Sequence, residues 1–277
     1  MRIKGNSSSF IDLLVTPNLI TSTVKALQHI QYNIDAYDTL LLNFPEELEE
    51  KIGELASEQI SLREFLQYIE RRELIPQPIT SWVYTAKPIL EALKGLSPYL
   101  KIDCYGSLEM EASSMDVSLA FAQLTLRTII TNKVDHDAWK ETATRSLQIN
   151  SERLREDSKR IQSKTCGAST CITGMSPSRL RKSLEESGAS VRVIYVEKPY
   201  HFTPLAILER KLMLCPLSDR EIEKLVLEHV DYVRNYVYLF RNRDRAHYEW
   251  ALDKVPWPKL GLERREISLL DNLIREP

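Results

Sequence analysis

The chain has 277 residues, of which 43% are hydrophobic and 27% charged, and its formal net charge is −2. This composition is typical of a globular protein with a sizeable core, and it excludes a disordered chain, a collagen and a disulfide-stapled scaffold. Glycine accounts for 8 residues, about 3% against a usual ~7%, so few loops can adopt positive φ and a helix-rich chain is favoured over an all-β fold.

Charge and cysteine content indicate where such a chain works. Residues 140–185 hold 10 Lys or Arg and 5 Asp or Glu, a net charge of +5 inside a mildly acidic chain. Such a basic segment attracts an anion or a nucleic acid, or forms a solvated helix face. The four cysteines and the polar N-terminus do not fit a secreted scaffold, and no run of roughly eighteen apolar residues occurs, so we expect a cytoplasmic protein without a membrane span.

The first half of the chain alternates short apolar runs with helical patterns. We predict strands at residues 2–4, 38–43 and 100–104. Pro17 suits a first helical turn, and apolar side chains follow it at helical spacing. Helices are predicted at 17–32, 46–55, 61–70 and 82–93, and two long helices between 108 and 162 are predicted to break near 133–135.

The second half contains a β-α-β pattern. We predict a strand at 169–173, a helix at 178–187 that Gly188 closes, and a strand at 191–196, which together are typical of a right-handed parallel crossover. Further helices are predicted at 203–214, 219–240 and 243–252. The fold class is therefore α/β, with a small, mostly parallel sheet and a large helical complement. We expect an α/β domain at 1–202 and, packed on it, a helical extension at 203–277.

Ligands of parallel α/β sheets bind beyond the carboxyl ends of the strands, so the residues after each predicted strand are the first candidates for a site. Gly5 and Gly174 each open a Gly-x-x turn, Tyr37-Asp38 precedes a buried strand, and a helix before the second turn carries Arg153. This order resembles the TraB/PrgY, ChaN and Tiki superfamily, which is related in fold to erythromycin esterase. The resemblance covers roughly residues 1–196.

The resemblance implies a metal- or anion-using site built from two Gly-x-x-His turns, an acidic residue after the second strand and a helical Arg. Here Ser8 and Pro177 occupy the two His positions, and Asn43 stands where the family favours Glu. Ser, Pro and Asn cannot replace the imidazole and carboxylate ligands of a divalent transition metal. We therefore expect no bound metal and no family catalysis.

Arg153 is the best match to the helical Arg of the family. An Arg offers five fixed donors, so we expect Arg153 to hold a small anion in a polar cleft formed with Asn6, Ser8 and Ser176. The alternative is structural: Gly5 and Gly174 permit sharp turns, and Ser7 or Ser176 caps the helix that follows it.

Other polar candidates lie outside this pattern. His201 stands between Pro199 and Pro204 after a predicted strand, and it is either a ligand-binding or a packing histidine. Cys166 and Cys171 have the spacing C-x4-C without a second pair, which indicates a structural thiol pair or a facultative disulfide rather than a zinc site. Residues 234–245 interleave Arg with aromatic side chains, the mixture that binds nucleic acids, although at helical spacing most of these aromatics face a core.

These observations favour a non-catalytic ligand-binding or regulatory protein whose partner is a small anionic ligand or another protein. No cofactor is assigned. Two alternatives stay open: a hydrolase-type enzyme that reuses the strand-end pocket, and a nucleic-acid-associated protein that uses the basic Arg/aromatic helix and binds less tightly as salt rises. The candidate ligand-binding residues are Gly5, Asn6, Ser8, Asn43, Arg153, Gly174, Ser176 and His201.

Overall fold

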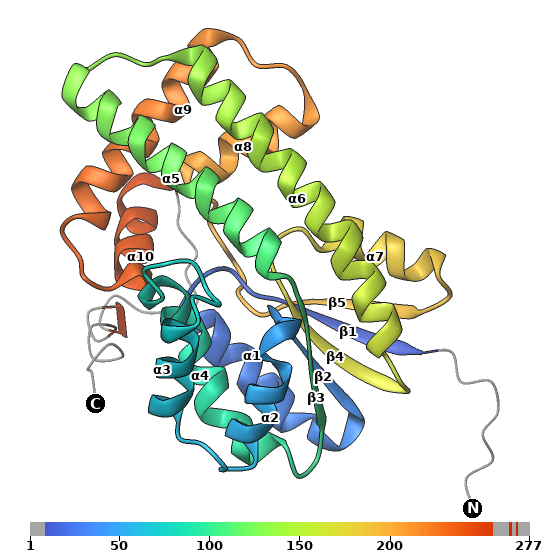
Figure 1. Cartoon of the computed structure of the whole chain (residues 1–277). Helices are drawn as coiled ribbons and strands as arrows, with labels where there is room; N and C mark the ends of the chain where they lie inside the picture. The colour runs from blue at the N-terminus through green and yellow to red at the C-terminus, as the bar shows by residue number, and fades with distance from the viewer. Residues whose placement is uncertain (1–8, 257–265, 268–269, 271–277) are drawn as a thin grey trace, which may run out of the picture. The chain divides into compact units, whose positions relative to one another are not determined.

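The computed structural model describes residues 9–256, 266–267 and 270, and its described strands form one parallel sheet with helices on both faces (Figure 1). The spatial order of the strands is β3-β2-β4-β1-β5. The predicted α/β class is confirmed. The strands are β1 (Phe10–Val15), β2 (Thr39–Pro45), β3 (Lys101–Gly106), β4 (Ala168–Thr173) and β5 (Ser190–Tyr195).

The helices follow the predicted pattern closely, including the two long helices and the break between them. Asp135 marks that break, because its carboxylate accepts a hydrogen bond of 3.2 Å from the N–H of Ala138 in the first turn of the second long helix. The helical segments are α1 (Ile20–Tyr32), η1 (Ile34–Ala36), η2 (Glu46–Leu48), α2 (Glu49–Ala56), α3 (Leu62–Arg71), α4 (Thr80–Leu96), α5 (Leu108–Thr131), α6 (His136–Lys164), α7 (Pro177–Glu186), α8 (Pro204–Leu214), α9 (Asp219–Tyr232), η3 (Val233–Val237) and α10 (Arg243–Lys254).

The chain divides into two compact units. We call residues 1–112 with 152–197 the sheet unit, and residues 113–151 with 198–277 the helical unit. The helical unit thus takes a segment from the middle of the chain in addition to the C-terminal residues, and the chain passes between the units inside α5, inside α6 and between Glu197 and Lys198.

The two faces of the sheet bury alternate residues of the same strands, as the two-residue period of a strand requires. Leu14, Leu40 and Leu42 belong to the cluster that helices α1 to α4 cover. Leu13 and Leu41 belong to the opposite cluster, which α6 and α7 cover. Because central strands β1, β2 and β4 are covered on both faces, they are almost continuously buried.

The helical unit has its own cores. Trp139 on α6 is fully buried, and its ring lies 5.8 Å from that of Phe121 on α5 and 5.9 Å from that of His229 on α9. A second cluster joins Tyr232 and Trp250, whose ring centroids are 5.4 Å apart. These contacts bring together segments that are far apart in the sequence.

The first strand differs from the prediction. Residues 2–4 and Gly5 lie outside the described residues, whereas Phe10–Val15, which the sequence pattern did not predict, forms the strand between β4 and β5. The other four predicted strands are confirmed within about two residues of their predicted ends. The helix predicted at 219–240 is too long, because α9 ends at Tyr232 and a π-helical turn, Val233–Val237, follows it.

Candidate functional site

The carboxyl end of β1, where a ligand of the sheet is expected, is closed by hydrogen bonds. Thr16 follows β1, and both its N–H (2.8 Å) and its Oγ1 hydroxyl (3.1 Å) donate to the carbonyl oxygen of Thr173. Beyond β5, the buried carboxylate of Glu197 accepts from Lys25 Nζ at 2.8 Å and from Ser22 Oγ at 3.3 Å. Lys25 and Ser22 thus tie α1 to the segment that follows β5.

Arg153 binds the first turns of α5. Its Nη2 donates to the carbonyl oxygen of Met110 at 2.7 Å and lies 3.3 Å from Oε1 of Glu111, and the side chain is 20% exposed. Of the three residues predicted to form a cleft with it, Asn6 and Ser8 lie outside the described residues and Ser176 is exposed. Met110 and Glu111 of its own chain thus engage this guanidinium.

A buried carboxyl that sequence reasoning missed lies one helical turn further along α6. Burial raises the pKa of Asp157 to about 7, against the opposing effect of the Arg153 and Arg160 guanidinium groups. In the sequence, Asp157 sits among alternating charges that are typical of a solvated helix face. No local signal therefore distinguishes it from its exposed neighbours.

The remaining strand-end candidates are spread over separate turns. Asn43 is half-buried in β2, and Gly174 is exposed after β4. Ser176 occupies the N-cap position of α7 but makes no side-chain capping hydrogen bond, so the predicted cap is wrong. Its ψ of 47° departs from the extended conformation that aims an N-cap hydroxyl at the first-turn amides.

An ion pair between a buried carboxylate and a partly exposed arginine joins β1 to β5 in the sheet unit. Asp12 is fully buried, and its carboxylate accepts from Arg192 Nε at 2.7 Å and from the Tyr37 hydroxyl at 2.6 Å. Burial, and then the bond to Asp12, raises the pKa of Tyr37 well above its ordinary value. His29 Nε2 lies 3.3 Å from the same hydroxyl. The arrangement holds the strands and α1 together.

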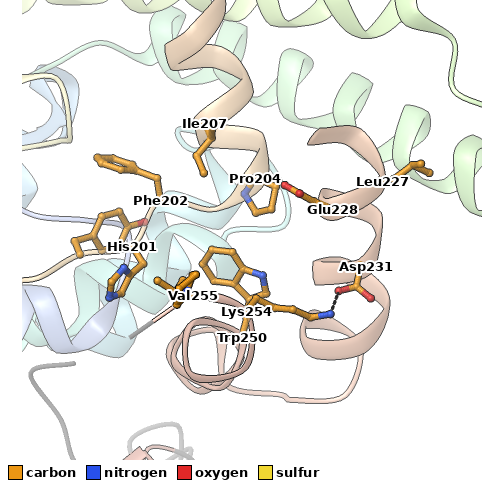
Figure 2. Close-up of a pocket in the computed structure, with 12 residues that line it drawn as sticks. His201, Phe202, Pro204, Ile207, Leu227, Glu228, Asp231, Trp250, Lys254 and Val255 are labelled. Carbon is orange, nitrogen blue, oxygen red and sulfur yellow. Dashed lines mark ion pairs between the residues drawn. The ribbon is translucent and has the colours of Figure 1, made fainter. Parts of the chain in front are cut away.

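The helical unit contains a pocket of about 810 Å³ (Figure 2). Of the candidates from the sequence, His201 lines it. In the view of Figure 2, His201 and Phe202 lie on one side of the Trp250 indole, and Asp231 lies on the other. The described residues that line the pocket are Tyr200, His201, Phe202, Pro204, Ile207, Leu227, Glu228, Asp231, Trp250, Lys254, Val255 and Pro256.

The acidic residues of the pocket lie on α9, and its lysine ends α10. Lys254 Nζ lies 2.8 Å from Oδ2 of Asp231, and Asn235 Nδ2 donates to Oδ1 of the same carboxylate at 2.6 Å. The bond to Lys254, followed by the bond to Asn235, outweighs partial burial and holds the pKa of Asp231 below its ordinary value. Glu228 adds a second carboxylate, so two acids and one lysine line this side.

A buried histidine supports the aromatic side of the pocket. The ring of His247 stacks on that of Tyr200 with centroids 5.0 Å apart and planes 11° apart. Burial, and then the nearby His201, lowers the pKa of His247 to about 4, so its imidazole is neutral at pH 7. A second aromatic ring of the pocket, Phe202, makes a cation–π contact with Arg210, whose guanidinium carbon lies 4.0 Å from the ring centroid.

The basic aromatic segment at 234–245 is only partly a core helix. Tyr236 is buried as predicted, but Leu239, three residues further along, is 70% exposed. The N–H of Tyr238 donates to the carbonyl oxygen of Val233 at 3.0 Å, an i→i+5 bond that shifts the helical register. Tyr238 is also exposed, and the nucleic-acid alternative stays a prediction.

The described part of the chain contains neither a cluster of metal ligands nor a disulfide. Among the described residues, no three His, Cys, Asp or Glu side chains gather as a metal ion requires. The absence of a bound metal stays a prediction. All four cysteines are free thiols, with Cys166 exposed and Cys171 buried, and burial raises the pKa of Cys171 above its ordinary value.

Comparisons with known proteins add no relative. No family model, no curated protein and no solved structure matches the chain. Membership of the TraB/PrgY, ChaN and Tiki superfamily therefore stays a prediction. Within the described residues, none of the helices combines the length and the apolar character that crossing a membrane requires.

Proposed function

We propose that this protein binds a small organic molecule in the pocket of the helical unit, and that binding rather than catalysis is its function. The observation that carries the proposal is the pocket itself, with its volume of about 810 Å³ and its aromatic and aliphatic walls. Small-molecule sites typically enclose about 300–1,000 Å³ and combine apolar walls with a few polar groups.

The walls of the pocket support a ligand with a flat apolar body. Tyr200, Phe202 and Trp250 supply aromatic surface, and Ile207 and Val255 supply aliphatic surface. Stacking on His247 and on Arg210 restrains two of these aromatic rings before any ligand arrives. Walls that are already ordered lose less conformational entropy on binding, which favours affinity.

The polar side of the pocket supports a neutral or cationic ligand over an anion. Asp231 and Glu228 are the acids that line it, and Lys254, the lysine that lines it, already pairs with Asp231. Glu228 has its own partner in Lys224, at 4.0 Å. A ligand anion would have to compete with Asp231 for Lys254, whereas a neutral or cationic ligand would not. The proposal thus replaces the small anionic ligand that the sequence indicates.

The residues of the pocket favour binding over covalent catalysis. His201 is a group that can act as a general base, but none of the described lining residues is a Ser, Thr or Cys that it could activate as a nucleophile. Asp231 is engaged by Lys254 and Asn235. The proposal retains the cytoplasmic location, because four free thiols suit a reducing compartment.

Fluorescence titration with Nile red, a neutral planar dye, tests the proposal on the full chain. We expect saturable binding with a stoichiometry of one. Ile207→Trp places an indole in the pocket and is expected to weaken binding about tenfold or more, because the dye and the new ring compete for the same volume.

A matched control lies on the same helix. Leu214 ends α8, is 80% exposed and does not line the pocket, so Leu214→Trp introduces the same side chain without filling the cavity. We expect wild-type affinity for this variant. If Ile207→Trp bound Nile red as tightly as Leu214→Trp, the dye would not occupy the pocket and the proposal would be wrong.

A further inference from the structure

Strand β5 is one of the two edges of the sheet (Figure 1). The N–H groups of Ser190 and Val196 donate to Ser9 and Val15, which places residues with even numbers toward β1. Because the direction of backbone hydrogen bonds alternates along a strand, the N–H and C=O groups of Val191 and Val193 point away from the sheet. These groups can pair with another strand.

The sequence of β5 carries little of what usually protects an edge. It reads Ser-Val-Arg-Val-Ile-Tyr, without a proline or a lysine, and its one charged side chain, Arg192, pairs with Asp12 of β1. Natural edge strands are blunted by such residues, by bulges or by covering side chains, and an edge without them pairs readily with another chain. At the opposite edge, the N–H of Cys104 in the middle of β3 is already engaged, since it donates to Oε2 of Glu49 at 2.9 Å.

A groove of about 470 Å³ runs beside this edge between β5 and α7. Val193 and Tyr195 contribute its strand side, and Ser178, Arg181, Lys182 and Glu185 contribute its helix side. The α7 helix connects the end of β4 to the start of the parallel strand β5, so it runs antiparallel to both. Its N-terminus is therefore near Tyr195, and its C-terminus is near Ser190.

The charges of α7 are divided between its two ends. Arg179, Arg181 and Lys182 lie in the first half, and Glu185 and Glu186 end the helix. Within the helix, Arg181 pairs with Glu185 at 2.7 Å and Lys182 with Glu186 at 3.8 Å. All four side chains are between 41% and 79% exposed, and such surface pairs stabilise a helix little, so a partner can compete for them. The basic and acidic ends are thus available to a partner of opposite polarity.

We propose that a second copy of this chain binds at the β5 edge. Antiparallel pairing of β5 with β5 of the second copy places Val193 opposite its own equivalent and Val191 opposite Tyr195. The twofold axis of such a pair is perpendicular to the sheet, so both α7 helices lie on the same face and run antiparallel. The basic end of each helix then faces the acidic end of the other.

The division of charge along α7 is the reason to propose a second copy of this chain rather than another protein as the partner. An interface with twofold symmetry must be complementary to itself, and a helix that is basic at one end and acidic at the other meets that condition when it lies antiparallel to its copy. The joined sheet would have ten strands, with the two β5 strands at its centre. The site is separate from the ligand pocket of the helical unit.

Sedimentation of the full chain tests the proposal at concentrations up to about 100 μM, which detects even weak pairing. We expect a dimer for the wild type and a monomer for Val193→Pro, because proline removes an outward N–H that forms no bond inside the sheet. Val193→Thr is the matched control: it also changes the side chain but keeps the N–H, and it is expected to remain dimeric. Thermal unfolding checks that both variants are folded.

A charge exchange gives a test that does not depend on the strand. Arg181→Glu with Lys182→Glu makes α7 uniformly acidic, and Glu185→Lys with Glu186→Lys makes it uniformly basic. We expect each double variant to be monomeric alone and the equimolar mixture to form a heterodimer. A monomeric wild type, a dimer that persists in Val193→Pro, or a mixture that fails to associate would each overturn the proposal.

Discussion

The sheet unit and the helical unit bury polar side chains in different ways. In the sheet unit, Asp12 and Glu197 are buried carboxylates, and each holds a cation, Arg192 or Lys25. In the helical unit, the buried ionisable groups include His229 and His247, which pack against the rings of Trp139 and Tyr200. These two carboxylates are paired with cations, whereas these two imidazoles pack among aromatic rings.

The difference follows from the acids and bases involved. A carboxylate at neutral pH stays charged unless its pKa rises by several units, so burying it demands a partner. An imidazole has an ordinary pKa near neutrality and becomes neutral at small cost. Burial lowers the pKa of His229 and of His247 to about 4. The ion pairs thus specify which segments meet, whereas the histidines make the helical unit sensitive to acid.

The largest expected effect comes from removing the aromatic support of His229. Trp139 is fully buried, and Trp139→Ala is expected to destabilise the helical unit by about 3–5 kcal/mol through lost burial and the cavity left behind. Hydrogen exchange with peptide resolution measures this loss unit by unit. Equal loss of protection in both units would contradict their separate cores.

A smaller effect is expected for the buried ion pair of the sheet unit. Asp12→Asn removes the charge that holds Arg192, and we expect a loss of about 1–3 kcal/mol, observed as faster exchange in β1 and β5. Glu58→Gln is the control, because the pair that Glu58 forms with Lys94 is exposed and should contribute little. Similar behaviour of the two variants would show that burial of Asp12 adds nothing.

A third expected effect is a change of stability with pH, and its sign differs between the units. Unfolded histidine takes up a proton near pH 6.5, whereas His229 and His247 in the folded chain stay neutral down to about pH 4. The unfolded state therefore binds more protons in this window, and the helical unit loses stability as the pH falls from 6.5 toward 4. Hydrogen exchange at pH 7 and pH 5, corrected for intrinsic rates, measures the loss.

Asp157 supplies the opposite sign. Its carboxyl keeps a proton up to about pH 7 when folded, whereas an ordinary Asp releases it near 3.8, so this group stabilises the sheet unit as the pH falls through 7. Asp157→Asn is expected to remove that gain, and His247→Phe is expected to reduce the acid sensitivity of the helical unit. Unchanged pH profiles in both variants would assign the dependence to other groups.

The sequence predicted most elements because their signals are local. Apolar spacing located the two long helices, and the capping residue Asp135 marked the break between them. The strand β1 was missed, since Asp12 interrupts its apolar run, and the residue that makes this Asp acceptable in a strand is Arg192, 180 positions away. The π-helical turn after Tyr232 was missed because its hydrogen bonds follow no side-chain period.

The candidate site was less accessible to prediction than the fold. His201 was singled out for its place between prolines, but the pocket also needs residues of α9 and α10, whose contribution depends on tertiary packing. Arg153 was chosen for a resemblance to a family motif, and the structure engages it with Met110 and Glu111. No single motif indicates that residues 200–207, 227–231 and 250–256 enclose one cavity.

The bond between Glu49 and the Cys104 N–H also limits how large an assembly can grow. A sheet whose two edges were both open could add copies head to tail and extend into a fibre. Of the two edges that the described strands form, β3 is occupied by the carboxylate of its own chain at Cys104, which leaves β5. A pair formed through β5 uses the same edge from both copies, so association through β5 ends at two chains.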